Sequence, residues 1–168
     1  MYLIKCGYWS ESGYTYFKFR KKNQITISQI IRPMEIIISD RRDIEKEHVL
    51  ELYSANKWSS VDKPQELYNG LINSHTLISA WINGRMVGIG NAISDGYLVV
   101  YYPHLLIHPE YQRKGIGKMI MRKMQERYKD FHMQMLTADG EALDFYQKLG
   151  FERAGKTEPM WIYHGTEH

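Results

Sequence analysis

Residues 112–118, with the sequence Gln-Arg-Lys-Gly-Ile-Gly-Lys, constrain the fold more than any other stretch of this chain. They follow a β-like run that ends at Ile107, and they open a segment with helical periodicity. Gly115 and Gly117 remove side chains where a helix exposes its first free N–H groups. Because these donors and the positive end of the helix dipole point outward together, such a terminus binds anions. The neighbouring lysines and arginine suit a ligand that carries phosphate.

Two better-known glycine motifs do not fit this stretch. A phosphate loop of the form G-x-x-x-x-G-K-[ST] requires glycine where Gln112 stands and Ser or Thr where Met119 stands. A dinucleotide fingerprint requires a third glycine where the chain has Ile120. Taken alone, the stretch is either a phosphate-binding loop of another kind or a glycine turn before an amphipathic helix.

The composition limits the classes of protein to which the chain can belong. A length of 168 residues, with 43% hydrophobic and 24% charged residues, is typical of one soluble globular domain. No apolar run approaches a membrane span, and Met1–Ser10 lacks the apolar centre of a secretory signal. Cys6 is the only cysteine, so an internal disulfide is impossible, and we expect a reducing, cytoplasmic location without membrane partners.

The net charge of +3 lies mainly at the start of the chain. Residues 1–33 contain six Lys or Arg side chains and one acidic residue, Glu11. Because the remainder is therefore not basic, we expect no nucleic-acid partner.

Residues 1–33 form an N-terminal extension, and residues 34–168 form the main domain of the predicted organisation. In the extension, Tyr14–Arg20 alternates and is followed by Ile25 and Ile27, which predicts a β-hairpin. An isolated hairpin is only marginally stable, so this one needs a surface such as a neighbouring subunit, which would give a homodimer. Met34 could itself be a translation start.

Strand and helix signals alternate after Met34, which predicts a mixed α/β domain. Asn83-Gly84 is a strong hairpin signal, Pro64 fits the first turn of a helix, and Gly150 fits a helix end. The helix after the glycine loop should bury Ile116, Met119, Ile120, Met124 and Tyr128. The predicted strands are Glu35–Ser39, Thr76–Ile82, Arg85–Ile93, Tyr97–Ile107, Phe131–Thr137, Phe151–Ala154 and Met160–Tyr163, and the other helices are Asp43–Asn56, one from Pro64, and Gly140–Leu149 with Asp139 as N-cap.

Pro103 interrupts the longest predicted strand, Tyr97–Ile107. Proline has no N–H to give to a sheet ladder, so this position marks an edge strand or a bulge. The alternative is a splay, in which the neighbouring strand separates from this one and leaves backbone N–H and C=O groups available for a ligand.

Two segments resemble the signatures of the GNAT N-acetyltransferase superfamily. Residues 105–117, Leu-Leu-Ile-His-Pro-Glu-Tyr-Gln-Arg-Lys-Gly-Ile-Gly, resemble its strand-to-loop motif Q/R-x-x-G-x-G/A. Residues 142–151, Ala-Leu-Asp-Phe-Tyr-Gln-Lys-Leu-Gly-Phe, resemble its second motif A-x-x-x-Y-x-x-x-G-F. The resemblance covers residues 34–163. Within it, the sequence from Pro103 to Phe151 is similar to that of bacterial and plastid arylalkylamine acetyltransferases.

This resemblance implies the GNAT acyl-CoA acyltransferase fold, a mixed twisted sheet whose central parallel strands splay apart between helices on both faces. The pantetheine arm of acetyl-CoA, the co-substrate, would pair with backbone groups in the splay, and N–H groups of the loop would hold the pyrophosphate. Residues assigned to acyl-CoA by the resemblance are Leu105, Leu106, Ile107, Gln112, Arg113, Lys114, Gly115, Ile116, Gly117, Lys118, Asp139 and Tyr146. Relatives often have Asn at the position of Asp139, so a plain helix cap is the alternative there.

The chemistry of acetyl transfer requires groups that move protons. An alkylammonium has a pKa of about 10, so little of it is a free nucleophile at neutral pH. The family position assigns protonation of the departing CoA thiolate to Tyr146 and stabilisation of the oxyanion to the Ile107 N–H. Relatives often carry Glu or His at the positions of Pro103 and Tyr101, and neither of these residues can act as a base. The resemblance therefore does not assign the group that accepts the amine proton. His104 is the candidate base, with a structural role as the alternative.

The predicted activity is direct transfer of an acetyl group, in a ternary complex, from acetyl-CoA to a primary amine of a small molecule. A protein N-terminal or lysine acetyltransferase is an alternative, and so is a non-catalytic acyl-CoA-binding regulatory module. Trp58, Tyr97, Tyr101 and Tyr102 could form an aromatic wall for the acceptor. His104 and His108 have the spacing of a metal pair, but a third ligand is not evident, so no metal is expected.

Overall fold

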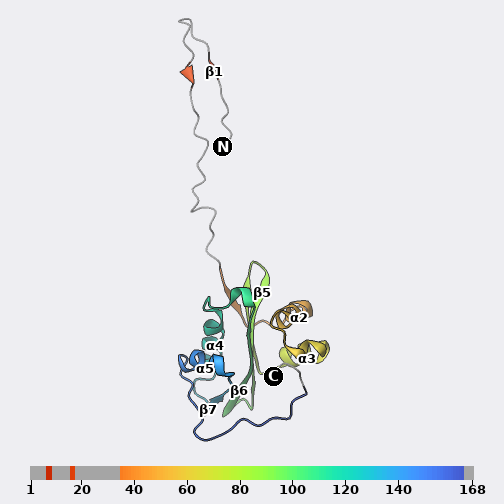
Figure 1. Cartoon of the computed structure of the whole chain (residues 1–168), viewed down its shortest axis with the longest axis vertical. Coiled ribbons are helices and arrows are strands. Elements are labelled where there is room, and N and C mark those ends of the chain that lie inside the picture. The colour runs from red at the N-terminus through yellow and green to blue at the C-terminus, as the bar shows by residue number, and fades with distance from the viewer. Residues whose placement is uncertain (1–6, 9–15, 18–34, 165–168) are drawn as a thin grey trace. The chain divides into compact units, whose positions relative to one another are not determined.

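A five-stranded mixed sheet with helices on both faces forms the main unit of the protein (Figure 1). The structure, a computed structural model, describes residues 7–8, 16–17 and 35–164. The chain divides into two compact units, residues 1–34 and residues 35–168. The strand order in the main sheet is β3-β4-β5-β6-β7, and only the last pair, β6 with β7, is parallel. The predicted mixed α/β class is therefore confirmed.

The N-terminal unit contains a short antiparallel pair, β1 (Gly7–Tyr8) and β2 (Tyr16–Phe17). β2 lies within the predicted strand Tyr14–Arg20, but its partner precedes it in the chain instead of following it. The predicted partner run around Ile25 and Ile27 lies outside the described residues.

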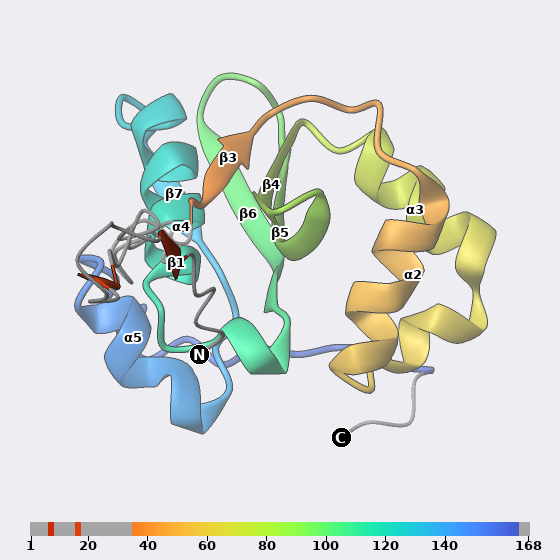
Figure 2. The same cartoon turned by 90° about the horizontal axis from the view of Figure 1, so that it is seen from above.

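Helices α2 (Lys46–Ala55) and α3 (Pro64–Ile72) cover one face of the sheet, and α4 (Ile116–Arg127) lies on the other (Figure 2). α2 starts three residues later than predicted, because Asp43 pairs with Arg41 and Glu45 keeps an extended backbone. The predicted apolar stripe of this helix is confirmed, since each of its members is at most 3% exposed: Ile44, Val49, Leu52 and Tyr53.

Strands β3 (Ile37–Ser39), β4 (Thr76–Ile82) and β5 (Arg85–Ser94) agree with the predicted runs. The turn between β4 and β5 has positive φ at Asn83 (51°) and Gly84 (81°), as the Asn-Gly signal predicts. Further along β5, a Cβ atom added at Gly90 would lie 2.8 Å from Ile120 of α4. Glycine therefore allows the helix to approach this strand closely.

The buried stripe of α4 differs from the predicted one at one position. Ile116, Ile120 and Met124 are buried as predicted, and so is Tyr128 at the helix end. Met119, however, is 40% exposed, and Met121 is fully buried in its place. Each step of four residues advances the stripe by about 40° around the helix, because a turn takes 3.6 residues. This drift moves the stripe toward Met121 and away from Met119.

The C-terminal part of the unit contains less β-structure than predicted. β6 (Val99–Ile107) is long, but β7 covers only Met133–Met135, followed by a short 3₁₀ turn, Gly140–Ala142, and helix α5 (Leu143–Gln147). The predicted strands Phe151–Ala154 and Met160–Tyr163 are wrong, because this segment is neither helix nor strand. Gly150 does end the helical segment, with φ of 91°.

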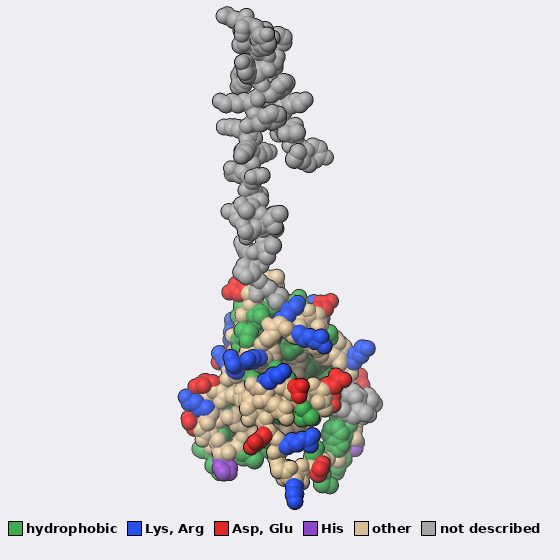
Figure 3. All heavy atoms as spheres, turned by 60° about the vertical axis from the view of Figure 1, so that its left-hand side comes forward, with side chains coloured by type: hydrophobic (Ala, Val, Ile, Leu, Met, Phe, Trp, Pro, Cys, Tyr) green, Lys and Arg blue, Asp and Glu red, His purple; other side chains and the backbone are tan. Residues whose placement is uncertain are grey.

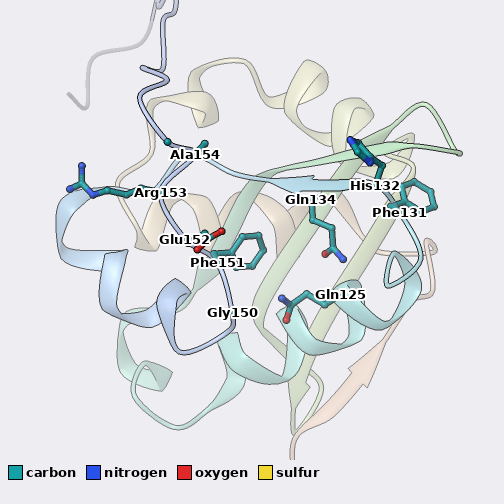
Figure 4. A pocket seen from close by; sticks show the side chains of 10 residues that line it. Gln125, Phe131, His132, Gln134, Gly150, Phe151, Glu152, Arg153 and Ala154 are labelled. Carbon is teal, nitrogen blue, oxygen red and sulfur yellow. The ribbon is translucent and has the colours of Figure 1, made fainter.

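A hollow of about 490 Å³ lies beside Phe151–Ala154, which does not pair with β7 (Figure 4). Side chains of Gln125, Phe131 and Gln134 line it, together with residues 150–155. A ladder requires neighbouring strands about 4.8 Å apart, and here the hollow separates the two backbones.

Among the described residues, none of the helices combines the length and the apolar character that a membrane crossing requires.

Candidate active site

Strand β6 contains a β-bulge at Pro103. Its pairing with β5 runs in register from Gly88–Ile107 to Asn91–His104, but the next pair is Ile93–Tyr101. Between these two pairs β6 therefore contains one residue more than β5, which defines a β-bulge. The predicted bulge at Pro103 is confirmed.

The bulge changes which side chains face each side of the sheet. Tyr102 packs in the core beside α4, whereas His104 contacts Tyr53 of α2 on the opposite face. In a regular strand these two residues would lie on the same face, since they are two positions apart. Beyond the bulge, Leu106 faces α2 and α3, and Leu105 and Ile107 face α4.

β6 and β7 separate beyond the bulge. They pair only from Val99–Met133 to Tyr101–Met135. The His108 N–H donates to the Val87 carbonyl at 2.9 Å, so the alternation of an antiparallel ladder also directs the backbone of Leu106 toward β5. The backbone N–H and C=O groups of Leu105 and Ile107 then point away from β5, into the splay. The splay is thus present, and it offers backbone groups of these two residues.

The glycine loop leads from β6 into α4 through a 3₁₀ turn, Pro109–Tyr111. Arg113 (φ 60°) and Gly115 (φ 84°) both adopt the left-handed conformation, and Gly115 is the N-cap of α4. The Met119 N–H donates to the Gly115 carbonyl at 3.1 Å, so residues 116–118 precede the first bonded turn. Their N–H groups have no partner within the helix, which is the arrangement expected of an anion site.

Basic side chains surround this loop, although not all of them extend from it. The Lys114 ammonium donates to the Glu110 carbonyl at 2.9 Å and lies over the Tyr111 ring. Gln112 donates to the Ile107 carbonyl at 3.2 Å, which ties the loop to the end of β6. In Figure 3, Lys and Arg side chains are spread over the α4 and α5 side, with acidic ones among them. Helix α4 contributes four basic residues and one acidic residue: Lys118, Arg122, Lys123, Arg127 and Glu126.

Gly117 brings three elements together. A Cβ atom added there would lie 3.4 Å from the Phe145 ring of α5 and 3.7 Å from Ile107 of β6. The loop, the splayed strand and α5 therefore meet at this glycine. A larger side chain would enter the space between them.

Tyr146 lies next to Phe145 on α5 and is half-buried. Its ring makes edge contacts with Phe145 and Phe151, at centroid distances of 5.0 and 5.9 Å. Burial raises the pKa of its hydroxyl, so this tyrosine remains protonated at neutral pH. Within residues 35–164 the hydroxyl has no hydrogen-bond partner, and its oxygen is partly exposed to solvent. Asp139 is the predicted cap, since its carboxylate accepts from the Gly140 N–H at 2.6 Å.

His104 lies in an aromatic cluster on the α2 face. Its Nδ1 is 2.7 Å from the Tyr53 hydroxyl, and its ring makes edge contacts with Tyr53 and Trp58. Burial lowers the pKa of His104 to about 4, so the imidazole is neutral at pH 7. Nε2 has no hydrogen-bond partner among the described residues and is partly exposed to solvent.

The expected aromatic wall is only partly assembled. Trp58 contacts His104, and Tyr101 on β6 is half-buried with its hydroxyl 3.0 Å from Thr137. Tyr97 is 83% exposed at the turn before β6. Tyr102 is 4% exposed on the opposite face, where it contacts Tyr128 and donates to Gln134, so it cannot contact an acceptor beside His104.

Two residues of the site were not identified from the sequence as functional. Tyr53 was predicted only as a core residue of α2, because its spacing fits an apolar stripe. Arg85 binds Glu51 of α2 at 2.7 Å and contacts His108 Nε2 at 3.0 Å, next to the loop. Neither residue has a local sequence signal, since both depend on contacts between distant segments.

The described residues contain no cluster of three or more His, Cys, Asp or Glu side chains that could hold a metal ion. The two histidines with metal-like spacing are directed elsewhere: His104 toward Tyr53, and His108 toward Arg85.

The low pKa of His104 predicts acid lability. In the unfolded chain a histidine binds a proton near its ordinary value of 6.5, whereas folded His104 does so only near 4. Stability is therefore lost as pH falls from 6.5 to 4, by up to about 3 kcal/mol. His104→Gln should lack this part of the loss. Urea unfolding at pH 7 and pH 4.5 measures it, and equal pH dependence in both proteins would contradict the prediction.

Comparison with known proteins agrees with this geometry. A protein-family model described as "Acetyltransferase (GNAT) domain" matches residues 41–160 of this chain. The uncharacterized N-acetyltransferase ycf52 of Gracilaria tenuistipitata var. liui is 37% identical over 39% of this chain and 37% of its own length. Similar solved structures include a GNAT family protein of Streptococcus pneumoniae TIGR4, with 28% identity, TM-score 0.65, and 77% of this chain and 98% of that one covered.

A second solved structure, an aminoglycoside N-acetyltransferase in complex with CoA, shares the fold at 18% identity. Its TM-score is 0.60, and the alignment covers 79% of this chain and 96% of that one. Because the family match spans well over half of the sequence and coincides with the splayed sheet and its glycine loop, this chain belongs to the GNAT acetyltransferase family.

Proposed function

We propose that this protein transfers an acetyl group from acetyl-CoA to a primary amine of a small molecule. The observation that carries the proposal is the meeting of the splay, the glycine loop and α5 at Gly117. The splay offers backbone groups of Leu105 and Ile107 to a pantetheine arm, and the unpaired N–H groups at the start of α4 suit its pyrophosphate. Arg113 and Lys118 supply positive charge beside that terminus.

Transfer proceeds directly in a ternary complex of enzyme, acetyl-CoA and amine. The neutral amine attacks the thioester carbonyl, and the Ile107 N–H, which points into the splay, stabilises the oxyanion. The attacking nitrogen loses its proton to water and the C–S bond breaks. Tyr146 protonates the departing CoA thiolate and regains a proton from solvent. Its raised pKa keeps the hydroxyl protonated until that step. His104 is the second catalytic residue that we propose, because its accessible Nε2 lies on the face from which the amine approaches.

Release of free CoA tests this function. The protein is incubated with acetyl-CoA and a panel of small amines, peptides with free N-termini and lysine peptides. CoA release that depends on a small amine supports the proposal. Release only with peptides would favour a protein acetyltransferase, and binding of acetyl-CoA without release would favour a regulatory module.

The acceptor should be an apolar or aromatic amine. Trp58 borders His104, and Tyr101 lies on the same face of β6. Aromatic walls bind aromatic ligands through face and edge contacts. We expect tryptamine to have a higher kcat/KM than polyamines or aminoglycosides, by about 1–3 kcal/mol in transition-state binding. Steady-state kinetics on this set measures the difference, and a preference for polyamines would contradict it.

We propose that residues 34–168 suffice for catalysis and that the N-terminal extension, residues 1–33, contributes to a homodimer. The GNAT match begins at residue 41, and residues 35–168 form a compact unit of their own. A chain that starts at Met34 should remain folded and active, but light scattering should show that it has lost the dimeric state of the full chain. A folded and inactive chain would contradict this division.

A further inference from the structure

We propose that Tyr53 is a positioning residue that fixes the tautomer of His104, so that His104 presents an N–H donor at Nε2 to the bound substrate instead of a proton acceptor. This inference rests on the proposed function for its catalytic meaning. The tautomer itself is a property of the protein without substrate.

The argument begins with the Tyr53 hydroxyl, which has one partner among the described residues. Tyr53 is fully buried, and its oxygen is 2.7 Å from His104 Nδ1. If Nδ1 carried the proton, the Tyr53 hydroxyl would accept it and its own hydrogen would have no acceptor. A buried donor without an acceptor is costly. The hydroxyl therefore donates to Nδ1, which places the imidazole proton on Nε2.

The ionisation of both groups agrees with this arrangement. Burial raises the pKa of Tyr53, so the hydroxyl keeps its hydrogen. Burial also lowers the pKa of His104 to about 4, and a hydrogen bond to the neutral form acts in the same direction. The described groups that face His104 are Tyr53 from α2, Trp58 before the turn Ser59–Asp62, and Asn91 from β5, and none of them carries a charge. The described residues around His104 therefore provide no negative charge that would stabilise an imidazolium.

The consequence concerns the substrate. A neutral imidazole with its proton on the accessible Nε2 cannot remove a proton from the amine at that nitrogen. It can donate a hydrogen bond to an oxygen or nitrogen lone pair of the acceptor molecule. We therefore infer that, among the aromatic amines, those whose ring carries a hydrogen-bond acceptor are preferred over those that lack one, and that water takes up the amine proton.

The tautomer is measured directly by long-range ¹H–¹⁵N correlation NMR on the full chain, with His104→Gln to assign the signals. Wild type should show the Nε2–H form from pH 5.5 to 8. Tyr53→Phe should show a mixture of tautomers and a His104 pKa closer to its ordinary value. Tyr68→Phe is the matched control, because its hydroxyl donates to the Ile44 carbonyl at 2.9 Å and does not touch His104. An Nδ1–H form in wild type, or no change in Tyr53→Phe, would overturn the proposal.

Kinetics separates a donor from a base. Glutamine can place an amide N–H near the position of Nε2, whereas alanine cannot. His104→Gln should therefore retain a kcat/KM about tenfold above that of His104→Ala, the scale of one hydrogen bond. Equal values for the two variants, whether both low or both high, would overturn the donor role. A wild-type chain without acetyltransferase activity would instead remove the proposed function and leave the NMR result standing.

Discussion

Gly117→Glu should abolish the stabilisation of this protein by acetyl-CoA. At a hundred times its dissociation constant, acetyl-CoA should raise the stability of the wild type by roughly 2.7 kcal/mol, which corresponds to a melting temperature higher by roughly 10 °C. In the variant, the side chain would start 3.4 Å from Phe145 and enter the space beside Ile107. Its negative charge would also meet the phosphates at the start of α4. Thermal unfolding with and without acetyl-CoA measures the effect.

Gly70→Glu is the control for this experiment. It adds the same side chain to α3, where a Cβ atom would meet nothing within 4 Å. It should respond to acetyl-CoA like the wild type. Gly117→Ala separates size from charge, since its methyl group would make ordinary contacts only. If saturating acetyl-CoA left the melting temperature of the folded wild type unchanged, the acyl-CoA site itself would be wrong.

Tyr146→Phe should lower kcat on the order of a hundredfold, the usual scale of a lost general acid. The ring would keep its edge contacts with Phe145 and Phe151, so stability and acetyl-CoA affinity should change little. The loss should be smaller for acyl donors whose leaving thiol has a lower pKa, because such a thiolate departs without protonation. Steady-state kinetics and acetyl-CoA titration separate the two effects.

Tyr111→Phe provides the comparison for Tyr146→Phe, because it removes the same kind of hydroxyl close to the same loop. Its kcat should stay within a fewfold of the wild type. Turnover near the wild-type value in Tyr146→Phe would assign Tyr146 to the core and leave the acid unidentified.

Most of the element order and the position of the glycine loop were predictable from sequence because each depends on local chemistry. Asn83-Gly84 requires positive φ whatever surrounds it, and Pro64 suits the first turn of a helix in any fold. Gly115 and Gly117 mark a helix start whose N–H groups must remain accessible. The sequence also indicated that Pro103 would disturb its strand, because a residue without an N–H cannot complete a ladder.

Only the tertiary structure decided what depends on partners far away in the chain. The bulge at Pro103 reverses the side on which His104 lies, and the contact with Tyr53 crosses 51 positions. The segment after Gly150 was predicted to contain two short strands, but it does not pair with another strand and is neither helix nor strand. Local propensity is a property of a few consecutive residues, whereas the tautomer of a buried histidine and the pairing of a strand are set by whichever groups the fold brings beside them.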